Sequence, residues 1–184
     1  MTKIAIIVYT LYGHIGTMAE SVWKGVESAG AECTIFQVPE TLTCEVLAKM
    51  GAPPKPDYPI ITAEQMEKYD GFIFGLSGRY GIMPAQMKTF MDSTGKLWKK
   101  GALVGKAAGC FFSSGTQGGG QETMGLTTVT FFAHHGMVFV PMGYIDREKR
   151  FSFAEARESD GIVFHFSRTC LVVCCLILLL VKIY

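Results

Sequence analysis

Five segments rich in aliphatic, β-branched and aromatic residues recur along the chain. They are residues 3–9 (KIAIIVY), 32–38 (ECTIFQV), 71–76 (GFIFGL), 107–113 (AAGCFFS) and 136–142 (GMVFVPM). Four of them are almost continuously apolar, which is typical of strands buried on both faces of a parallel sheet. The second alternates apolar with polar positions, which favours an edge strand.

Helical patterns occupy residues 16–30, 62–70, 84–98 and 118–136. The first ends at Gly30, a suitable C-terminal cap, and the second opens with a capping-box sequence. Strands that alternate with helices predict an α/β fold. We expect a flavodoxin-like, doubly wound, five-stranded parallel sheet of order 2-1-3-4-5, with helices on both faces.

In a doubly wound fold, ligands bind outside the carboxyl ends of the strands. The first such loop, "YTLYGHIGTM" (9–18), makes a tight turn at Gly13 before a helix expected to begin near Gly16. It is neither a Walker A loop nor a G-x-G-x-x-G turn. A helix start offers N–H groups and a favourable dipole to a phosphate, although an ordinary capped βα turn would look the same.

Two glycine-rich loops follow the third and fourth runs, "LSGRYGIMP" (76–84) and "SSGTQGGGQE" (113–122). Glycines let backbone approach a ligand closely. Taken singly, the loops are also compatible with a turn carrying a solvated arginine and with a flexible surface loop. One phosphate-binding turn and two ring-flanking loops at the same sheet edge together favour flavin mononucleotide (FMN).

Composition narrows the class of protein. The 184 residues include 17 Lys+Arg and 16 Asp+Glu, for a net charge of +1, so we expect no nucleic-acid partner. The near-neutral charge also argues against a small acidic electron carrier. The six cysteines match neither a zinc site nor a C-x-x-C pair. The N-terminus does not resemble a signal peptide, and we expect a cytoplasmic protein.

Four longer segments carry a family resemblance: "YTLYGHIGTMAE", "SGRYGIMPAQMKTFMDSTGKLW", "SSGTQGGGQETM" and "FFAHHGMVFVPMGY". With "QVPET" they cover residues 3–144 in order. This ordered set resembles the WrbA-type NAD(P)H:quinone oxidoreductases of the flavodoxin-like fold, including their fungal relatives. The resemblance implies an FMN enzyme that takes two electrons from NADH or NADPH, reduces quinones to hydroquinones and protects against quinone redox cycling.

The resemblance also implies roles for individual residues. The segment matching the FMN phosphate loop is Thr10, Leu11, Tyr12, Gly13, His14 and Ile15, and the segments flanking the flavin ring are Gly78, Arg79 and Tyr80 on one side and Ser114, Gly115, Thr116, Gln117, Gly118 and Gly119 on the other. Tyr12 matches a position near the nicotinamide nucleotide, and Trp98 an aromatic that covers the quinone pocket. His134 matches a flavin-contacting, catalytic histidine. The family assembles as tetramers with sites at subunit interfaces, so the resemblance implies a homo-tetramer or dimer in which Trp98 or His134 acts across a subunit boundary.

The chain departs from the family pattern at two matched positions. Gly78 stands where the family usually has threonine, which removes one hydroxyl contact to FMN. Gln117 stands where a glycine is common.

The residues themselves are compatible with cofactor chemistry. Hydride transfer needs no side-chain nucleophile, since the cofactor carries the reaction. "AHHG" (133–136) lacks further metal ligands, so we expect no metal and a structural role for His135. Trp98 on its own fits an ordinary core position equally well. The alternative function is an FMN-binding regulatory protein with little turnover.

The last forty residues, 145–184, do not match the family and form a separate region after a domain spanning 1–144. They are charged at first and then apolar, with twelve uninterrupted apolar residues at 170–181. That length is about 18 Å as a helix, short of the roughly 30 Å hydrocarbon core. A structural cover for the sheet and a membrane anchor are both open, but the favoured interpretation is an aberrant terminus.

Overall fold

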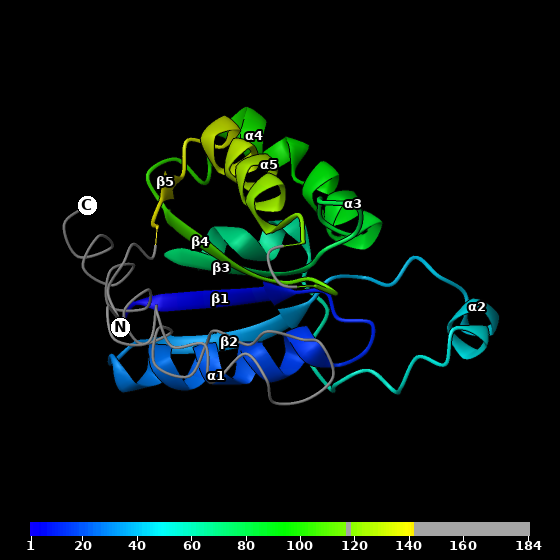
Figure 1. The fold of residues 1–184 in the computed structure, drawn as a ribbon. Helices are drawn as coiled ribbons and strands as arrows, with labels where there is room; N and C mark the ends of the chain where they lie inside the picture. Colours follow the sequence, from blue (N-terminus) through cyan, green and yellow to red (C-terminus); the bar gives the residue numbers. More distant parts are fainter. Residues whose placement is uncertain (117–118, 142–184) are drawn as a thin grey trace.

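The computed structural model describes residues 1–116 and 119–141. Five parallel strands form one sheet of order β2-β1-β3-β4-β5 (Figure 1). The strands are β1 Lys3–Val8, β2 Glu32–Gln37, β3 Gly71–Ser77, β4 Ala107–Ser113 and β5 Val138–Phe139. The predicted fold class and strand order are confirmed, and the alternating strand β2 lies at an edge.

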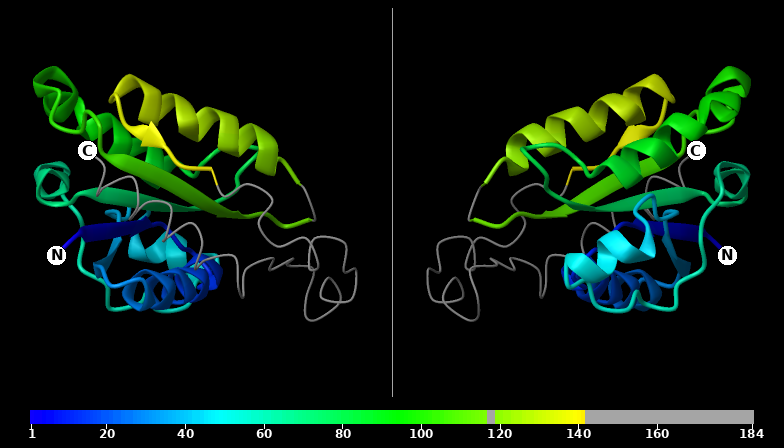
Figure 2. Two further views of the ribbon diagram at one scale, coloured as in Figure 1. Left: turned by 90° about the vertical axis from the view of Figure 1, so that its left-hand side faces the viewer. Right: turned by 90° about the vertical axis from the view of Figure 1, so that its right-hand side faces the viewer.

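Helices cover both faces of the sheet, as expected. One face carries α1, His14–Ser28, and the opposite face carries α3 Ala85–Ser93, α4 Gly95–Lys100 and α5 Gln121–His134 (Figures 1 and 2). A 3-10 helix spans Ala63–Lys68, where the backbone N–H of Thr62 donates to Gln65 Oε1 at 2.7 Å. The short helix α2, Cys44–Lys49, lies apart from the sheet on an arm formed by residues 39–60 (Figure 1).

Several element boundaries differ from those expected. Helix α1 begins at His14 rather than near Gly16, and the single helix expected over 84–98 is two helices that meet at Thr94. Of the strand expected over 136–142, the described residues 136–141 form a strand at Val138–Phe139, and residue 142 lies outside the described residues. Helix α2 was not expected, because its residues are all at least partly exposed and so show no buried apolar face.

The middle of the sheet is buried on both sides. Residues Ile4 to Val8 of β1 are each no more than 1% exposed. In β3, a Cβ added at Gly75 would lie 2.4 Å from Phe111 Cζ and 2.9 Å from Val8 Cγ1. The Phe111 ring therefore occupies the place of a side chain at Gly75, and β1, β3 and β4 pack closely at this point.

The end of α5 is tied to the junction of α3 and α4 by a buried hydrogen bond. His135 Nε2 lies 2.9 Å from Thr94 Oγ1, which itself donates to Met91 O at 2.6 Å. Because the Thr94 proton is already used, His135 Nε2 carries the ring proton and donates it. Burial, with a smaller effect of His134, lowers the pKa of His135. These contacts fit the structural role expected for His135.

The separate region predicted at 145–184, including 170–181, lies outside the described residues. Over 1–116 and 119–141, none of the helices has the length and apolar character that crossing a membrane requires.

Candidate functional site

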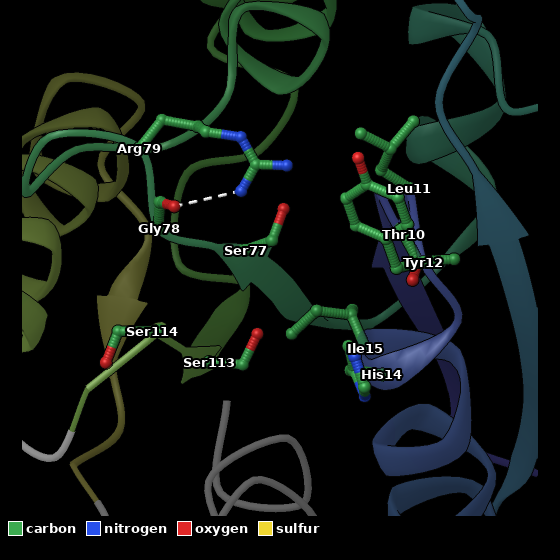
Figure 3. Close-up of a pocket in the computed structure, with 11 residues that line it drawn as sticks. Thr10, Leu11, Tyr12, His14, Ile15, Ser77, Gly78, Arg79, Ser113 and Ser114 are labelled. Atoms are coloured by element: carbon green, nitrogen blue, oxygen red, sulfur yellow. Dashed lines mark hydrogen bonds between the residues drawn. The ribbon is translucent and has the colours of Figure 1, made fainter. Parts of the chain in front are cut away.

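A cavity of about 210 Å³ lies at the carboxyl edge of the sheet, where the loops after β1, β3 and β4 meet (Figure 3). Its lining residues are Thr10, Leu11, Tyr12, His14, Ile15, Ser77, Gly78, Arg79, Ser113, Ser114 and Gly115. The three loops singled out from the sequence therefore line one pocket. Most of the predicted site residues lie in it.

The loop after β1 is a compact turn that leads directly into α1. Thr10 is buried, and its Oγ1 accepts a hydrogen bond from the backbone N–H of Gly13 at 3.1 Å. Gly13 is the N-cap of α1, with φ of 92°, a conformation that L-residues rarely adopt. N–H groups in the first turn of a helix have no intrahelical acceptor, and no acidic residue occurs in the first turn of α1. This end of the pocket suits an anion.

The loop after β3 is a two-residue hairpin closed by Arg79 and Ile82. The N–H of each donates to the carbonyl of the other, at 2.8 and 3.0 Å. The central residues Tyr80 and Gly81 have φ of 53° and 78°, as a type I′ turn requires. This turn leaves the Tyr80 side chain fully exposed and outside the pocket lining. Arg79 points into the pocket, and its Nη1 donates to Gly78 O at 3.0 Å (Figure 3).

The loop after β4 is held by its own polar groups. Ser114 Oγ donates to Thr116 O at 2.8 Å and accepts from Gln121 Nε2 at 2.9 Å. The backbone N–H of Gly119 donates to Thr116 O at 3.0 Å. Predicted residues Gln117 and Gly118 lie outside the described residues.

Two lining residues were not among the predicted site residues, Ser77 and Ser113. They are the last residues of β3 and β4 and are partners in the sheet register. Ser77 Oγ is buried and has no hydrogen-bond partner among the residues that the structure describes. A strand's final residue faces the ligand edge in this fold, and that position was the signal available in the sequence.

Trp98 and His134 do not reach this pocket within one chain. Helix α5 runs back from the carboxyl edge of the sheet, so its fourteen residues carry His134 about 20 Å toward the amino edge (Figure 1). Trp98 lies on α4 and is 59% exposed. Neither side chain is among the residues that line the pocket of its own chain. Their action across a subunit boundary stays a prediction.

The side chains that line the pocket give it a positive rather than a negative character. Its lining residues, all within the described part of the chain, include the cation Arg79 and no carboxylate. Over residues 1–116 and 119–141, no three His, Cys, Asp or Glu side chains gather as a metal would require. The site can therefore hold an anionic organic ligand through an arginine, hydroxyls and backbone N–H groups.

A partly buried polar cluster beside the pocket anchors the arm 39–60. Glu40 accepts from Tyr9 Oη at 3.2 Å and from Gln86 Nε2 at 3.2 Å, and it pairs with Lys55 Nζ at 2.5 Å. Burial acts to raise the pKa of Glu40, but hydrogen bonds from Lys55 and from backbone N–H groups outweigh it, so the pKa is lowered. The carboxylate stays ionised and joins both ends of the arm to β1.

The sequence and the fold were compared with known proteins. Residues 2–149 match the family model described as NADPH-dependent FMN reductase. The P25 protein of Schizosaccharomyces pombe is 55% identical over 141 residues, covering 77% of this chain and 70% of the relative. The quinone-oxidoreductase QR2 of Triphysaria versicolor is 56% identical over 144 residues, covering 78% and 70%.

Among solved structures, a flavodoxin-type, WrbA-like protein from Agrobacterium tumefaciens superposes with a TM-score of 0.62 at 19% identity. It covers 100% of this chain and 97% of that chain. The fold and pocket define a doubly wound α/β protein with a ligand site at the carboxyl edge of its sheet. The chain belongs to the NADPH-dependent FMN reductase family of enzymes, and the family resemblance found in its motifs is confirmed.

Proposed function

We propose that the protein is an FMN-dependent NAD(P)H:quinone oxidoreductase that reduces quinones to hydroquinones by two electrons. The observation that carries this proposal is the acid-free pocket between the start of α1 and two glycine-containing loops. Relatives named for quinone reduction add support. They include QR2 and the NAD(P)H quinone oxidoreductase PST2 of Candida albicans, which is 54% identical over 142 residues.

The residues present fit FMN. Residues 10–15 offer a helix start, hydroxyls and no opposing acid to the phosphate. Gly78 and Arg79 on one side and Ser114 and Gly115 on the other would flank the ring, with Arg79 as the nearby cation. The cavity of about 210 Å³ is smaller than the roughly 300–1,000 Å³ of typical ligand sites. FMN would therefore fill it and extend beyond it, between the loops after β3 and β4, here called the two outer loops. When bound, FMN supplies the two-electron chemistry.

Tyr12, Trp98 and His134 would serve the two substrates. Tyr12 is 47% exposed at the pocket, and its Oη donates to Met50 O at 3.3 Å, so its ring is held where NADH or NADPH would approach. Trp98 and His134 would be supplied by a neighbouring subunit of a homo-tetramer or dimer, Trp98 as an apolar wall for the quinone and His134 as a hydrogen-bonding and proton-carrying group. We place the enzyme in the cytoplasm, protecting against quinone redox cycling.

An anaerobic experiment tests the function. The purified full chain, supplemented with FMN and freed of excess, is mixed with NADH or NADPH while flavin absorbance is followed, and benzoquinone is then added. We expect rapid bleaching by the nucleotide and recovery of the absorbance on quinone addition. Bound flavin that neither nucleotide bleaches would refute the oxidoreductase and favour a regulatory flavin-binding protein. A chain that retains no flavin would refute both.

A further inference from the structure

Among the described residues, Ser77 lines the pocket with a buried hydroxyl that has no hydrogen-bond partner. Its Oγ has no partner among the described residues, although buried polar groups in native proteins are nearly always hydrogen-bonded. Ser77 lines the cavity, and Figure 3 shows its hydroxyl entering the same space as the Arg79 guanidinium. A ligand in the cavity would supply the missing partner.

The position of Ser77 indicates which part of a ligand it meets. Strand β3 lies between β1 and β4 in the sheet. The anion-binding turn follows β1, whereas the two outer loops begin after the ends of β3 and β4. Ser77 and its register partner Ser113 therefore form the floor between the turn and the loops. A ligand with its anionic end at the turn and its ring between the loops must cross this floor.

The next residue, Gly78, carries no hydroxyl, and a side chain there would be crowded. A Cβ at Gly78 would lie 3.2 Å from Met124 Cε and 3.3 Å from Ser113 O, tighter than ordinary contact. Of the residues at the end of β3 that line the cavity, Ser77 alone carries a side-chain hydroxyl. The side-chain hydroxyl available at this point of the lining is therefore that of Ser77, the last residue of β3.

We propose that Ser77 Oγ hydrogen-bonds the polyol chain of the bound flavin, the segment that joins the ring to the phosphate. This assignment rests on the proposed function, because it takes a flavin nucleotide as the ligand. Ser77 would then be a binding residue for the polyol chain, separate from the residues that hold the phosphate and the ring.

Three flavins separate the possible contacts. FMN has ring, polyol and phosphate; riboflavin lacks the phosphate; lumiflavin lacks both polyol and phosphate. Their dissociation constants are measured by flavin fluorescence on the full chain and on Ser77→Ala. We expect Ser77→Ala to weaken FMN and riboflavin binding by about 2- to 10-fold, the loss of one net hydrogen bond, and to leave lumiflavin binding unchanged.

The matched control is Ser28→Ala, which removes a hydroxyl that donates to Gly25 O at the far end of α1. It should leave all three constants unchanged. Flavin-free Ser77→Ala should resist urea as well as the wild type, since the Ser77 hydroxyl has no hydrogen-bond partner to lose among the described residues.

Other outcomes overturn the assignment. A loss confined to FMN would place the contact at the phosphate, and an equal loss for all three flavins would place it at the ring. Unchanged FMN and riboflavin binding would remove Ser77 from the site. If the wild-type chain binds none of the flavins, the proposed function fails as well, which distinguishes the two failures.

Discussion

Gly120 and Gly81 bring the two outer pocket loops into backbone contact, and replacing Gly120 with alanine should separate them. A Cβ at Gly120 would lie 2.6 Å from Gly81 Cα, which is backbone and cannot rotate away. Gly120 also has φ of 72°. The left-handed conformation costs alanine about 1–2 kcal/mol, and overpacking adds about 1–3 kcal/mol. We expect Gly120→Ala to lose about 2–5 kcal/mol of unfolding free energy.

Two controls isolate the contact. A Cβ at Gly81, with φ of 78°, would have its nearest neighbour, Thr123 Cβ, at an ordinary 3.7 Å, and one at Gly105, also with φ of 78°, would meet nothing within 4 Å. Both alanine variants should therefore lose only the conformational cost of about 1–2 kcal/mol. Urea unfolding measures the three losses, and FMN fluorescence should show weaker binding for Gly120→Ala than for Gly105→Ala. Equal losses in the three variants would refute the backbone contact.

Three further predictions concern other glycines and His135. Gly13 and Gly30 share a positive φ and open surroundings, so alanine at either position should lower the free energy of unfolding by about 1–2 kcal/mol. Only Gly13→Ala, at the pocket, should also raise the Kd for FMN, measured by fluorescence titration. Gly75→Ala should lower the free energy of unfolding, measured with urea, by at least about 2 kcal/mol. Gly95→Ala, in helix α4 with nothing within 4 Å, should instead raise it by about 0.5–1 kcal/mol. Because the pKa of His135 is lowered below its ordinary 6.5, the folded state favours the neutral ring. That stability is full above pH 6.5 and is lost as pH falls through the folded pKa, so the urea midpoint should drop more steeply with acid in the wild type than in His135→Gln; parallel profiles would contradict this.

Periodicity and strand composition were enough to predict the sheet. Apolar runs such as 3–9 and 71–76 are typical of strands buried on both faces, and the helices that alternate with them along the chain favour a parallel sheet. Once the strand order is known, the loops after β1, β3 and β4 must meet at one edge. Glycines at positions 13 and 81 then indicated where backbone turns tightly, and both have positive φ.

Other features depend on tertiary contacts that no local pattern encodes. Thr94 interrupts the helix expected over 84–98, where its hydroxyl bonds both Met91 O and the His135 ring from a distant helix. Ser77 resembles any polar residue at a strand end until the burial and isolation of its hydroxyl are seen. The type I′ turn that directs Tyr80 away from the pocket requires a positive φ at both Tyr80 and Gly81. A tyrosine in the sequence does not predict a positive φ, because non-glycine residues rarely adopt one.

The contact between His135 and Thr94 also constrains how a second subunit would complete the pocket. It joins the last turn of α5, which carries His134, to the start of α4, where the backbone N–H of Trp98 donates to Thr94 O at 3.1 Å. His134 and Trp98 therefore belong to one rigid corner of the molecule, away from its own pocket. If a neighbouring subunit presents His134 to a flavin, Trp98 arrives with it, and the histidine and the aromatic wall are delivered by a single interface.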